Sequence, residues 1–232
     1  MAGTIVPQRP ALKFVPATRI QQSLVASAEK QVLLWLALRT PASINSDHLT
    51  LLGFISQCLA GVCYALVRVN PEMLLLVTGC LFLNWLGDSL DGTLARVRNR
   101  QRPRYGFYVD HISDSVAAFF LMGGLAVSGC VHPAIALGLL IAFLMLSIEA
   151  YLATYTLGRF HLSHGWFGPT EIRILLAIGN IALLRSSTFK IFDARILLFD
   201  FGGVIAIAGM ILFLVVSIIR HTAQLYKEER IA

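Results

Sequence analysis

The sequence predicts an all-α, polytopic membrane protein, on the basis of its composition and of the spacing of its apolar runs. Hydrophobic residues make up 56% of the 232 residues and charged residues 14%, whereas a typical soluble domain has roughly 45–50% and about 25%. The basic residues lie between long apolar runs. A soluble enzyme, a disulfide-rich secreted module and a disordered chain therefore fit the sequence poorly.

Six stretches are candidates for membrane-spanning helices. A span takes about 20 mainly apolar residues in a helix, because no backbone polar group can go unpaired in hydrocarbon. The fourth stretch contains Glu149, and the fifth is short unless it begins near Gly168. We expect the six spans at residues 49–67, 72–87, 115–131, 133–157, 174–184 and 201–219.

An additional helix is expected before the first span. Residues 21–38 mix apolar side chains with Ser, Glu and Lys and end shortly before Pro41. This pattern is typical of an amphipathic helix that lies in the membrane interface, with a soluble linker helix as the alternative. Residues 1–16 lack the apolar core of a signal peptide, so we expect no cleavage there.

The basic residues also predict the orientation in the membrane. With the N-terminus inside, 15 Lys and Arg residues fall in cytoplasmic segments and four on the opposite side. The positive-inside rule then places both termini in the cytoplasm. The cations do not form one patch with interleaved aromatic residues, so no nucleic-acid partner is expected. The four cysteines lack a CxxC or Cys/His pattern and are interpreted as buried thiols.

Acidic residues are concentrated around the connection between the second and third spans. Asp88 and Asp91 are three residues apart and Asp110 and Asp114 four apart, so each pair shares one face of a helix. Carboxylates this close at a membrane boundary repel each other unless a cation lies between them. Oxygen ligands suit Mg²⁺, Mn²⁺ or Ca²⁺. The alternative, acids that merely balance the neighbouring arginines, explains neither the helical spacing nor the glycines.

Two glycines and an arginine accompany these acids. Gly92 lies one turn before Arg96, and Gly106 lies one turn before Asp110. The missing side chains leave room for a bulky or phosphorylated ligand beside the backbone. Arg96 is suited to holding a phosphate by bidentate hydrogen bonds.

Together these residues resemble the signature of the CDP-alcohol phosphotransferase family, D-x2-D-G-x2-A-R-x8-G-x3-D-x3-D. One extra residue separates Arg96 from Gly106, in a connection where an insertion costs little. Residues 49–54 and 168–173 also resemble the starts of the family's first and fifth spans. All eight fixed positions are met, by Asp88, Asp91, Gly92, Ala95, Arg96, Gly106, Asp110 and Asp114.

The resemblance implies an integral membrane homodimer of phospholipid biosynthesis. Such an enzyme transfers a substituted phosphoryl group from a CDP-linked donor to an alcohol acceptor and releases CMP. Residues 46–224 are then the six-helix transmembrane catalytic domain, residues 1–45 the cytoplasmic N-terminal segment and residues 225–232 the cytoplasmic tail. The active site is expected at the cytoplasmic side, in contact with membrane lipids.

The resemblance also assigns roles to single residues. It implies that Asp88, Asp91 and Asp110 bind Mg²⁺ or Mn²⁺, and that Asp114 completes the metal site and acts as the general base. Gly92, Ala95, Arg96 and Gly106 are expected to line the nucleotide and phosphate pocket. Apart from the resemblance, Glu171 and Arg173 are candidates for binding the acceptor because they lie at the cytoplasmic end of the fifth span, and Arg159 with Arg173 would supply cations for a phosphorylated acceptor.

The direction of transfer is open at this point. CDP-diacylglycerol as donor to a small polar alcohol is favoured by the short chain with six spans. The pattern Asp110-His111-x2-Asp114-Ser115 instead resembles the branch that transfers from CDP-choline or CDP-ethanolamine to diacylglycerol. A transporter and a non-catalytic membrane subunit are alternatives of another class. Carrier sites gather near the bilayer midplane, whereas these acids lie at one end of two helices.

Two further residues allow two interpretations each. Glu149, within an apolar run, either marks a functional site or forms a hydrogen bond between helices as a neutral acid. His111, beside the acids, either contacts a phosphate or has a structural role.

Overall fold

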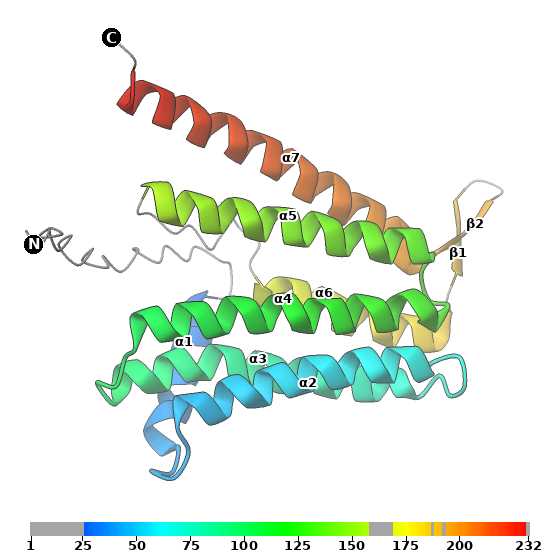
Figure 1. Cartoon of the computed structure of the whole chain (residues 1–232). Helices are drawn as coiled ribbons and strands as arrows, with labels where there is room; N and C mark the ends of the chain where they lie inside the picture. Colours follow the sequence, from blue (N-terminus) through cyan, green and yellow to red (C-terminus); the bar gives the residue numbers. More distant parts are fainter. Residues whose placement is uncertain (1–25, 158–168, 187, 192–193, 231–232) are drawn as a thin grey trace, which may run out of the picture.

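The computed structural model describes residues 26–157, 169–186, 188–191 and 194–230. Helices make up nearly all of these residues, together with one small antiparallel sheet (Figure 1). The elements are α1 (Ala26–Arg39), α2 (Ser46–Leu66), α3 (Met73–Val97), α4 (Pro103–Ser128), α5 (Pro133–Leu157), α6 (Pro169–Arg185), β1 (Thr188–Ile191), β2 (Ala194–Leu197) and α7 (Leu198–Glu228). The predicted all-α membrane fold is confirmed.

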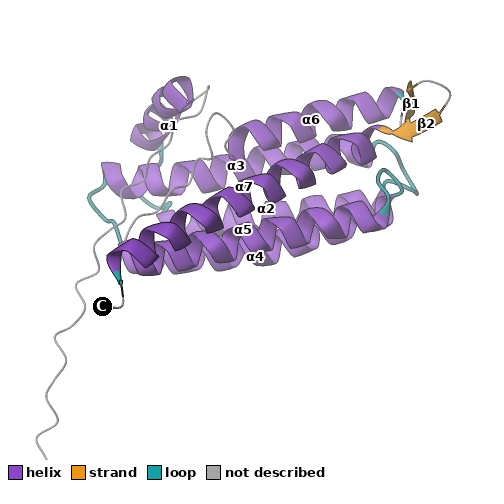
Figure 2. Ribbon diagram, turned by 90° about the horizontal axis from the view of Figure 1, so that it is seen from above, coloured by secondary structure: helices purple, strands orange, loops and turns teal. Residues whose placement is uncertain are grey.

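Helices α2 to α7 run side by side as a bundle, and α1 lies across one end of it (Figures 1 and 2). The α3–α4 turn and the end of α7 lie at this same end. The opposite end carries the α2–α3 and α4–α5 turns and the β1–β2 hairpin. The bundle therefore has one end where α1, the α3–α4 turn and the last turns of α7 come together.

Five helices of the described chain are long and apolar enough to cross a membrane: α2, α3, α4, α5 and α7. Helix α6 has 17 residues and falls short of this group, so the sixth span stays a prediction. Many large apolar side chains on these helices are exposed, among them Phe119, Leu152 and Leu212. Such a surface suits lipid rather than water.

Two helices extend beyond their predicted spans toward the α3–α4 turn. Helix α3 continues to Val97, whereas the predicted span ended at residue 87. Helix α4 begins at Pro103, well before the predicted start at residue 115. The hydropathy pattern marks only the part of a helix that faces lipid. Polar residues at the ends of these two helices remain helical because the backbone hydrogen bonds continue through them.

Glycine pairs hold α2 directly against α3 and α4. A side chain at Gly87 of α3 would place its Cβ 2.5 Å from the Leu49 carbonyl oxygen and 2.6 Å from the Gly53 nitrogen of α2. A Cβ at Gly124 of α4 would overlap the Gly61 backbone of α2. Small residues allow membrane helices to pack this closely. Helix α2 is therefore central, and its first turns lie between the signature residues of α3 and α4.

A buried polar link joins α6 to this group of helices. The Tyr64 hydroxyl donates to Asn180 Oδ1 at 2.8 Å, and Asn180 Nδ2 donates to Thr78 Oγ1 at 3.4 Å. Tyr64 and Asn180 are completely buried. The surrounding core is apolar and includes Val77, Leu81 and Leu121. The link connects α2, α3 and α6 inside a medium in which an unpaired polar group is costly.

Helix α1 forms where the amphipathic helix was predicted, although residues 21–25 lie outside the described residues. Leu33 and Ala37 pack against Leu90 and Leu94 of α3. Trp35 is 53% exposed, and the Arg39 guanidinium lies 4.1 Å from the centre of its ring. An aromatic ring beside a cation on an exposed face is typical of a helix at a membrane interface.

The connection between α6 and α7 contains a short β-hairpin. Strands β1 and β2 pair antiparallel, with Thr188 opposite Leu197. At the same end of the bundle, α4 stops at Gly129, whose φ of 79° lies in the left-handed region that favours glycine. Both features belong to the end opposite the signature residues (Figure 1).

Candidate active site

A small pocket lies between α2, α3 and α4, and it brings together three of the four signature carboxylates. Asp88 comes from α3, and Asp110 and Asp114 come from α4. The pocket residues that come from α2 include no acid. The lining residues are Thr50, Gly53, Phe54, Gln57, Asn84, Asp88, Asp110, Ser113, Asp114 and Ala117. Three of the four signature acids therefore border one pocket between α3 and α4.

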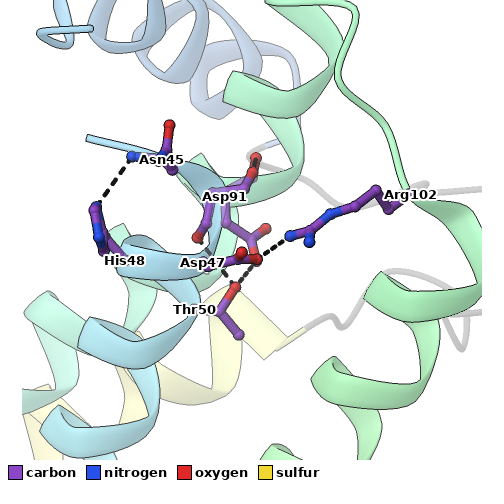
Figure 3. A network of polar contacts seen from close by, with 7 residues as sticks. Asn45, Asp47, His48, Thr50, Asp91 and Arg102 are labelled. Carbon is purple, nitrogen blue, oxygen red and sulfur yellow. Dashed lines mark hydrogen bonds and ion pairs between the residues drawn. The ribbon is translucent and has the colours of Figure 1, made fainter. Parts of the chain in front are cut away.

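The fourth carboxylate, Asp91, is turned toward the start of α2. Its Oδ2 accepts a hydrogen bond from the Thr50 hydroxyl at 2.8 Å (Figure 3). Its backbone oxygen accepts a hydrogen bond from the Ser46 hydroxyl at 2.6 Å. Asp91 is not among the described residues that line the pocket. Two α2 hydroxyls therefore fix α3 one turn beyond Asp88 and orient the Asp91 carboxylate.

The start of α2 is linked to the start of α4 by an ion pair. Asp47, in the first turn of α2, forms an ion pair with Arg102, the residue before α4 (Figure 3). Both side chains are about half exposed, so this pair contributes little to stability. The backbone N–H of Asn45 donates to His48 Nδ1 at 3.2 Å and completes a capping box at the start of α2.

A second arginine of the α3–α4 turn holds the connection between α1 and α2. The Arg98 guanidinium donates to the carbonyl oxygens of Thr40, Pro41 and Ile44 at 2.5 to 2.9 Å. These carbonyls lie beyond the last turn of α1, where helical partners are lacking. Arg98 therefore has a structural role, which the sequence alone did not reveal.

The residues expected to bind the nucleotide lie just outside the pocket. Arg96 Nη2 donates to Thr93 Oγ1 at 3.0 Å, and Arg96 Nη1 lies 3.5 Å from where a Cβ of Gly92 would be. The guanidinium thus lies over the missing side chain of Gly92. Ala95 is half-buried on the same helix.

Gly106 lies in the first turn of α4, and a Cβ at this position would meet nothing within 4 Å. Its backbone N–H bonds to the Arg102 carbonyl oxygen at 2.8 Å, as in a regular turn. Neither packing nor backbone conformation within the described residues requires glycine here. Open space beside the signature acids fits the expectation that Gly106 leaves room for a ligand.

The candidate acceptor-binding residues differ in where they lie. Arg173, on α6, donates to Asp88 Oδ2 at 2.7 Å, and the two side chains are 16% and 31% exposed. Arg173 therefore contacts one of the acids that line the pocket. Glu171 is buried, with 8% exposure, and does not line the pocket. Arg159 lies outside the described residues.

The donor set fits a hard divalent cation in its chemistry, because it consists of carboxylate oxygens around one pocket. In residues 26–157, 169–186, 188–191 and 194–230, no group of three or more His, Cys, Asp or Glu side chains is arranged around one point. Asp88 is engaged by Arg173 and Asp91 by Thr50. A cation at this site would have to compete with both contacts.

Glu29 of α1 is a residue that sequence reasoning missed. Its Oε1 accepts hydrogen bonds from Trp85 Nε1 at 2.8 Å, Ser89 Oγ at 3.1 Å and Thr170 Oγ1 at 3.0 Å. The Glu29 side chain is buried. Its three donors come from α3 and α6, next to the ion pair between Arg173 and Asp88. No spacing pattern signals this contact, because its partners are distant in sequence.

The two ambiguous residues both have structural contacts. Glu149 Oε1 lies 2.5 Å from Nδ1 of His221, so the pair links α5 to α7; the sequence analysis had not singled out His221. The His111 ring stacks on Phe107, with 4.1 Å between ring centres, and lies 4.9 Å from Tyr151. These contacts favour the interhelical role for Glu149 and the structural role for His111.

The fold and the pocket define a polytopic helical membrane protein with a carboxylate-rich site at one end of its bundle. The sequence model of the CDP-alcohol phosphatidyltransferase family matches residues 44–220, and the chain belongs to this family. No curated protein matches the sequence at a significant level. The family transfers a phosphate group from a CDP-alcohol to an acceptor and generally depends on divalent cations.

Proposed function

We propose that the protein transfers a phosphatidyl group from CDP-diacylglycerol to a small polar alcohol and releases CMP, as a step of phospholipid biosynthesis. The observation that carries this proposal is the meeting of Asp88, Asp110 and Asp114 at one pocket at the end of the bundle. At such a position a nucleotide arrives from water while acyl chains stay among the exposed apolar side chains. The short six-helix domain favours this donor over a CDP-amino alcohol.

In this proposal Asp88, Asp91 and Asp110 hold Mg²⁺ or Mn²⁺, with Asp114 completing the site. A bound cation would neutralise charge on the pyrophosphate and make the attacked phosphorus more electrophilic. Thr50 supports the assignment of Asp91, because its hydrogen bond to Asp91 Oδ2 holds the carboxylate in one orientation. Arg173 in turn balances the charge of Asp88.

Asp114 acts as the general base in the proposed reaction. It lies one turn from Asp110 on α4, lines the pocket and is exposed. As the acceptor oxygen attacks phosphorus, its proton passes to the Asp114 carboxylate. The bond from that phosphorus to the bridging oxygen breaks, and CMP leaves with the electron pair. Direct attack requires no covalent enzyme intermediate.

The remaining signature residues would hold the nucleotide. Arg96 is exposed, donates to Thr93 and lies over Gly92. Its guanidinium is suited to a phosphate of the donor. Open space at Gly106 and the small side chain of Ala95 leave room for the cytidine. Arg159, Glu171 and Arg173 are proposed to bind the acceptor, and the contact of Arg173 with Asp88 supports its place in this set.

A panel of substrates tests the proposal. The purified protein, in nanodiscs with Mg²⁺ or Mn²⁺, is combined with CDP-diacylglycerol, CDP-choline or CDP-ethanolamine and with several alcohols. We expect CMP release from CDP-diacylglycerol in the presence of a small polar alcohol. Release from CDP-choline or CDP-ethanolamine with diacylglycerol would instead establish the other direction of transfer. No release with any pair would favour a non-catalytic subunit or a transporter.

We also propose that the site and both termini face the cytoplasm and that the protein is a homodimer. The end of the bundle that carries α1 and the last turns of α7 also carries the arginines of residues 96–104, which supports this orientation under the positive-inside rule. A reporter fused after residue 232 tests the orientation. Mass measurement of the protein in nanodiscs tests the dimer, and a monomeric mass would exclude it.

A further inference from the structure

The inner end of the pocket is lined by two side-chain amides rather than by acids. Asn84 lies one turn from Asp88 along α3, on the side away from the α3–α4 turn. Gln57 lies one turn from Gly53 along α2, in the same direction. Both residues border the same small space as Asp114 and Ala117 of α4. The signature of the family contains neither amide.

Asn84 presents a hydrogen-bond acceptor that has no donor. Its Nδ2 donates to the Gly53 carbonyl oxygen at 3.0 Å, which fixes the orientation of the amide because only the nitrogen donates to a carbonyl. The residue is 3% exposed. Asn84 Oδ1 is buried and accepts no hydrogen bond from the described part of the chain. Such an acceptor is costly to bury, and most have a partner in folded proteins.

Gln57 of α2 supplies the complementary group in the same pocket. The residue is half-buried, and no hydrogen bond of its amide is formed among the residues that the structure describes. Its neighbours on α2, Ile55 and Leu59, are exposed on the outer surface of the bundle. An amide on a membrane-spanning helix is unfavourable unless it finds a partner. The amide of Gln57 is therefore open to a ligand in the pocket.

We propose that Asn84 Oδ1 and the Gln57 amide form a hydroxyl subsite, which binds a second hydroxyl of the acceptor alcohol. A hydroxyl donates to Asn84 Oδ1 and accepts from Gln57 Nε2 at the same time. An ester carbonyl only accepts, so it would leave Asn84 Oδ1 without a partner. This inference rests on the proposed function, because it concerns the acceptor of that reaction.

The subsite has a direct consequence for the choice of acceptor. Asp114 lines the same pocket, so an alcohol bound by one hydroxyl at Asn84 and Gln57 presents a neighbouring hydroxyl to the proposed base. A polyol meets both requirements, whereas an alcohol with a single hydroxyl meets only one. A site that binds a substrate hydroxyl rejects the analogue that lacks it, since the buried partners are then unpaired.

Matched pairs of acceptors test the subsite. Glycerol 3-phosphate is compared with 3-hydroxypropyl phosphate, which lacks the middle hydroxyl, and myo-inositol is compared with a monodeoxy-myo-inositol, which lacks one hydroxyl. For the wild-type protein we expect kcat/KM to favour one polyol over its partner by about tenfold or more, as for the loss of one well-placed hydrogen bond. In Gln57→Met, which keeps the length of the side chain, this preference falls to about twofold or less.

A control variant separates this effect from a general loss of folding. Ile55→Met lies on the exposed face of the same helix and is expected to keep the wild-type preference. Gln57 is the better test position, since Asn84 also holds Gly53 and its substitution would disturb the packing of α2 on α3. A wild-type enzyme that turns over both members of each pair equally, or a Gln57→Met variant with an unchanged preference, overturns the inference.

Equilibrium binding decides the inference independently of turnover. Saturation-transfer NMR of the four acceptors with wild-type protein and Gln57→Met reports contact without any reaction. A polyol signal that exceeds that of its analogue, and that is lost in Gln57→Met, supports the subsite even if no donor gives CMP and the proposed function fails. Equal signals in wild type and variant overturn the subsite even if CMP release is observed.

Discussion

Arg173 of α6 donates a 2.7 Å hydrogen bond to Asp88 Oδ2 of α3, and so joins a helix outside the signature to its first acidic residue. Both side chains are largely shielded from solvent, where a charge-assisted hydrogen bond is strong and the loss of one partner is costly. In the proposed mechanism Asp88 also binds a cation. Arg173 and the cation then compete for the same carboxylate.

Replacing Arg173 by Gln is expected to strengthen binding of Mn²⁺ severalfold, because a competing positive charge is removed. We also expect kcat/KM for the acceptor to fall at least tenfold, since the guanidinium is proposed to bind the acceptor. Electron paramagnetic resonance of Mn²⁺ gives the first quantity and CMP release the second. Arg173→Lys keeps the charge and is expected to bind Mn²⁺ as wild type does. Weaker Mn²⁺ binding in Arg173→Gln would rule out competition.

Replacing Asp114 by Asn is expected to abolish CMP release while the protein remains folded and inserted in the membrane. The amide is nearly isosteric with the carboxylate but does not accept a proton, so the acceptor hydroxyl is not activated. CMP release is measured alongside the thermal unfolding midpoint. Ser113→Ala, at the neighbouring pocket position, serves as the control and should retain most activity. Turnover at the wild-type rate in Asp114→Asn would remove the general-base assignment.

Removal of divalent cations by a chelator is expected to stop CMP release. Addition of Mg²⁺ or Mn²⁺ in excess should restore it, because the carboxylates need a cation to bind the donor pyrophosphate. The assay compares untreated, chelated and reconstituted protein in the same nanodiscs. Activity that survives thorough chelation would contradict the metal site.

Because α2 and α4 approach each other closely, we expect substitutions at two adjacent glycines of α4 to differ in their effect on stability. In Gly124→Ala the new methyl group overlaps the Gly61 backbone, so the helices must separate. We expect a loss of roughly 1–3 kcal/mol of stability, as for overpacking in a core. Gly123→Ala meets nothing within 4 Å and should leave the unfolding midpoint nearly unchanged. Equal midpoints for the two variants would show that the helices are not in contact at Gly61.

The buried carboxylate of Glu29 should anchor α1 to the site. Glu29→Ala leaves the donors on Trp85, Ser89 and Thr170 without their acceptor, and each hydrogen bond to a charged group contributes about 1.5–3 kcal/mol. We expect faster proteolysis of residues 26–39 in the variant. Glu29→Gln keeps an acceptor oxygen and is expected to behave more like wild type. Identical proteolysis of the alanine variant and wild type would argue against anchoring.

The sequence predicted the helical fold, and local spacing brought three of the four signature acids close together. Asp88, Asp110 and Asp114 lie at one pocket because helical spacing and a short turn leave little freedom. The extended ends of α3 and α4 were not predicted, since hydropathy registers contact with lipid and not helix length. The β1–β2 hairpin was also missed, because short strands in a connection have no clear pattern.

Contacts between segments that are distant in the sequence could not be predicted from the sequence alone. Thr50 with Asp91, Glu29 with Ser89 and Arg98 with the α1–α2 connection each join residues that are more than 40 positions apart. No single-sequence period encodes such pairs. Arg173 was a candidate for the acceptor site from its place in the sequence, but its contact with Asp88 emerges only when α6 packs on α3.

Helix α6 forms hydrogen bonds to its neighbours at two levels along the bundle axis. Arg173 bonds to Asp88 at the end of the bundle, and Asn180 bonds to Tyr64 and Thr78 within it. The two residues are seven positions apart, so they lie on the same face about two turns from each other. Hydrogen bonds at these two levels oppose both the sliding of α6 along its axis and its rotation about that axis. The position along the bundle axis of α6, the shortest described helix of the bundle, is therefore set by its neighbours.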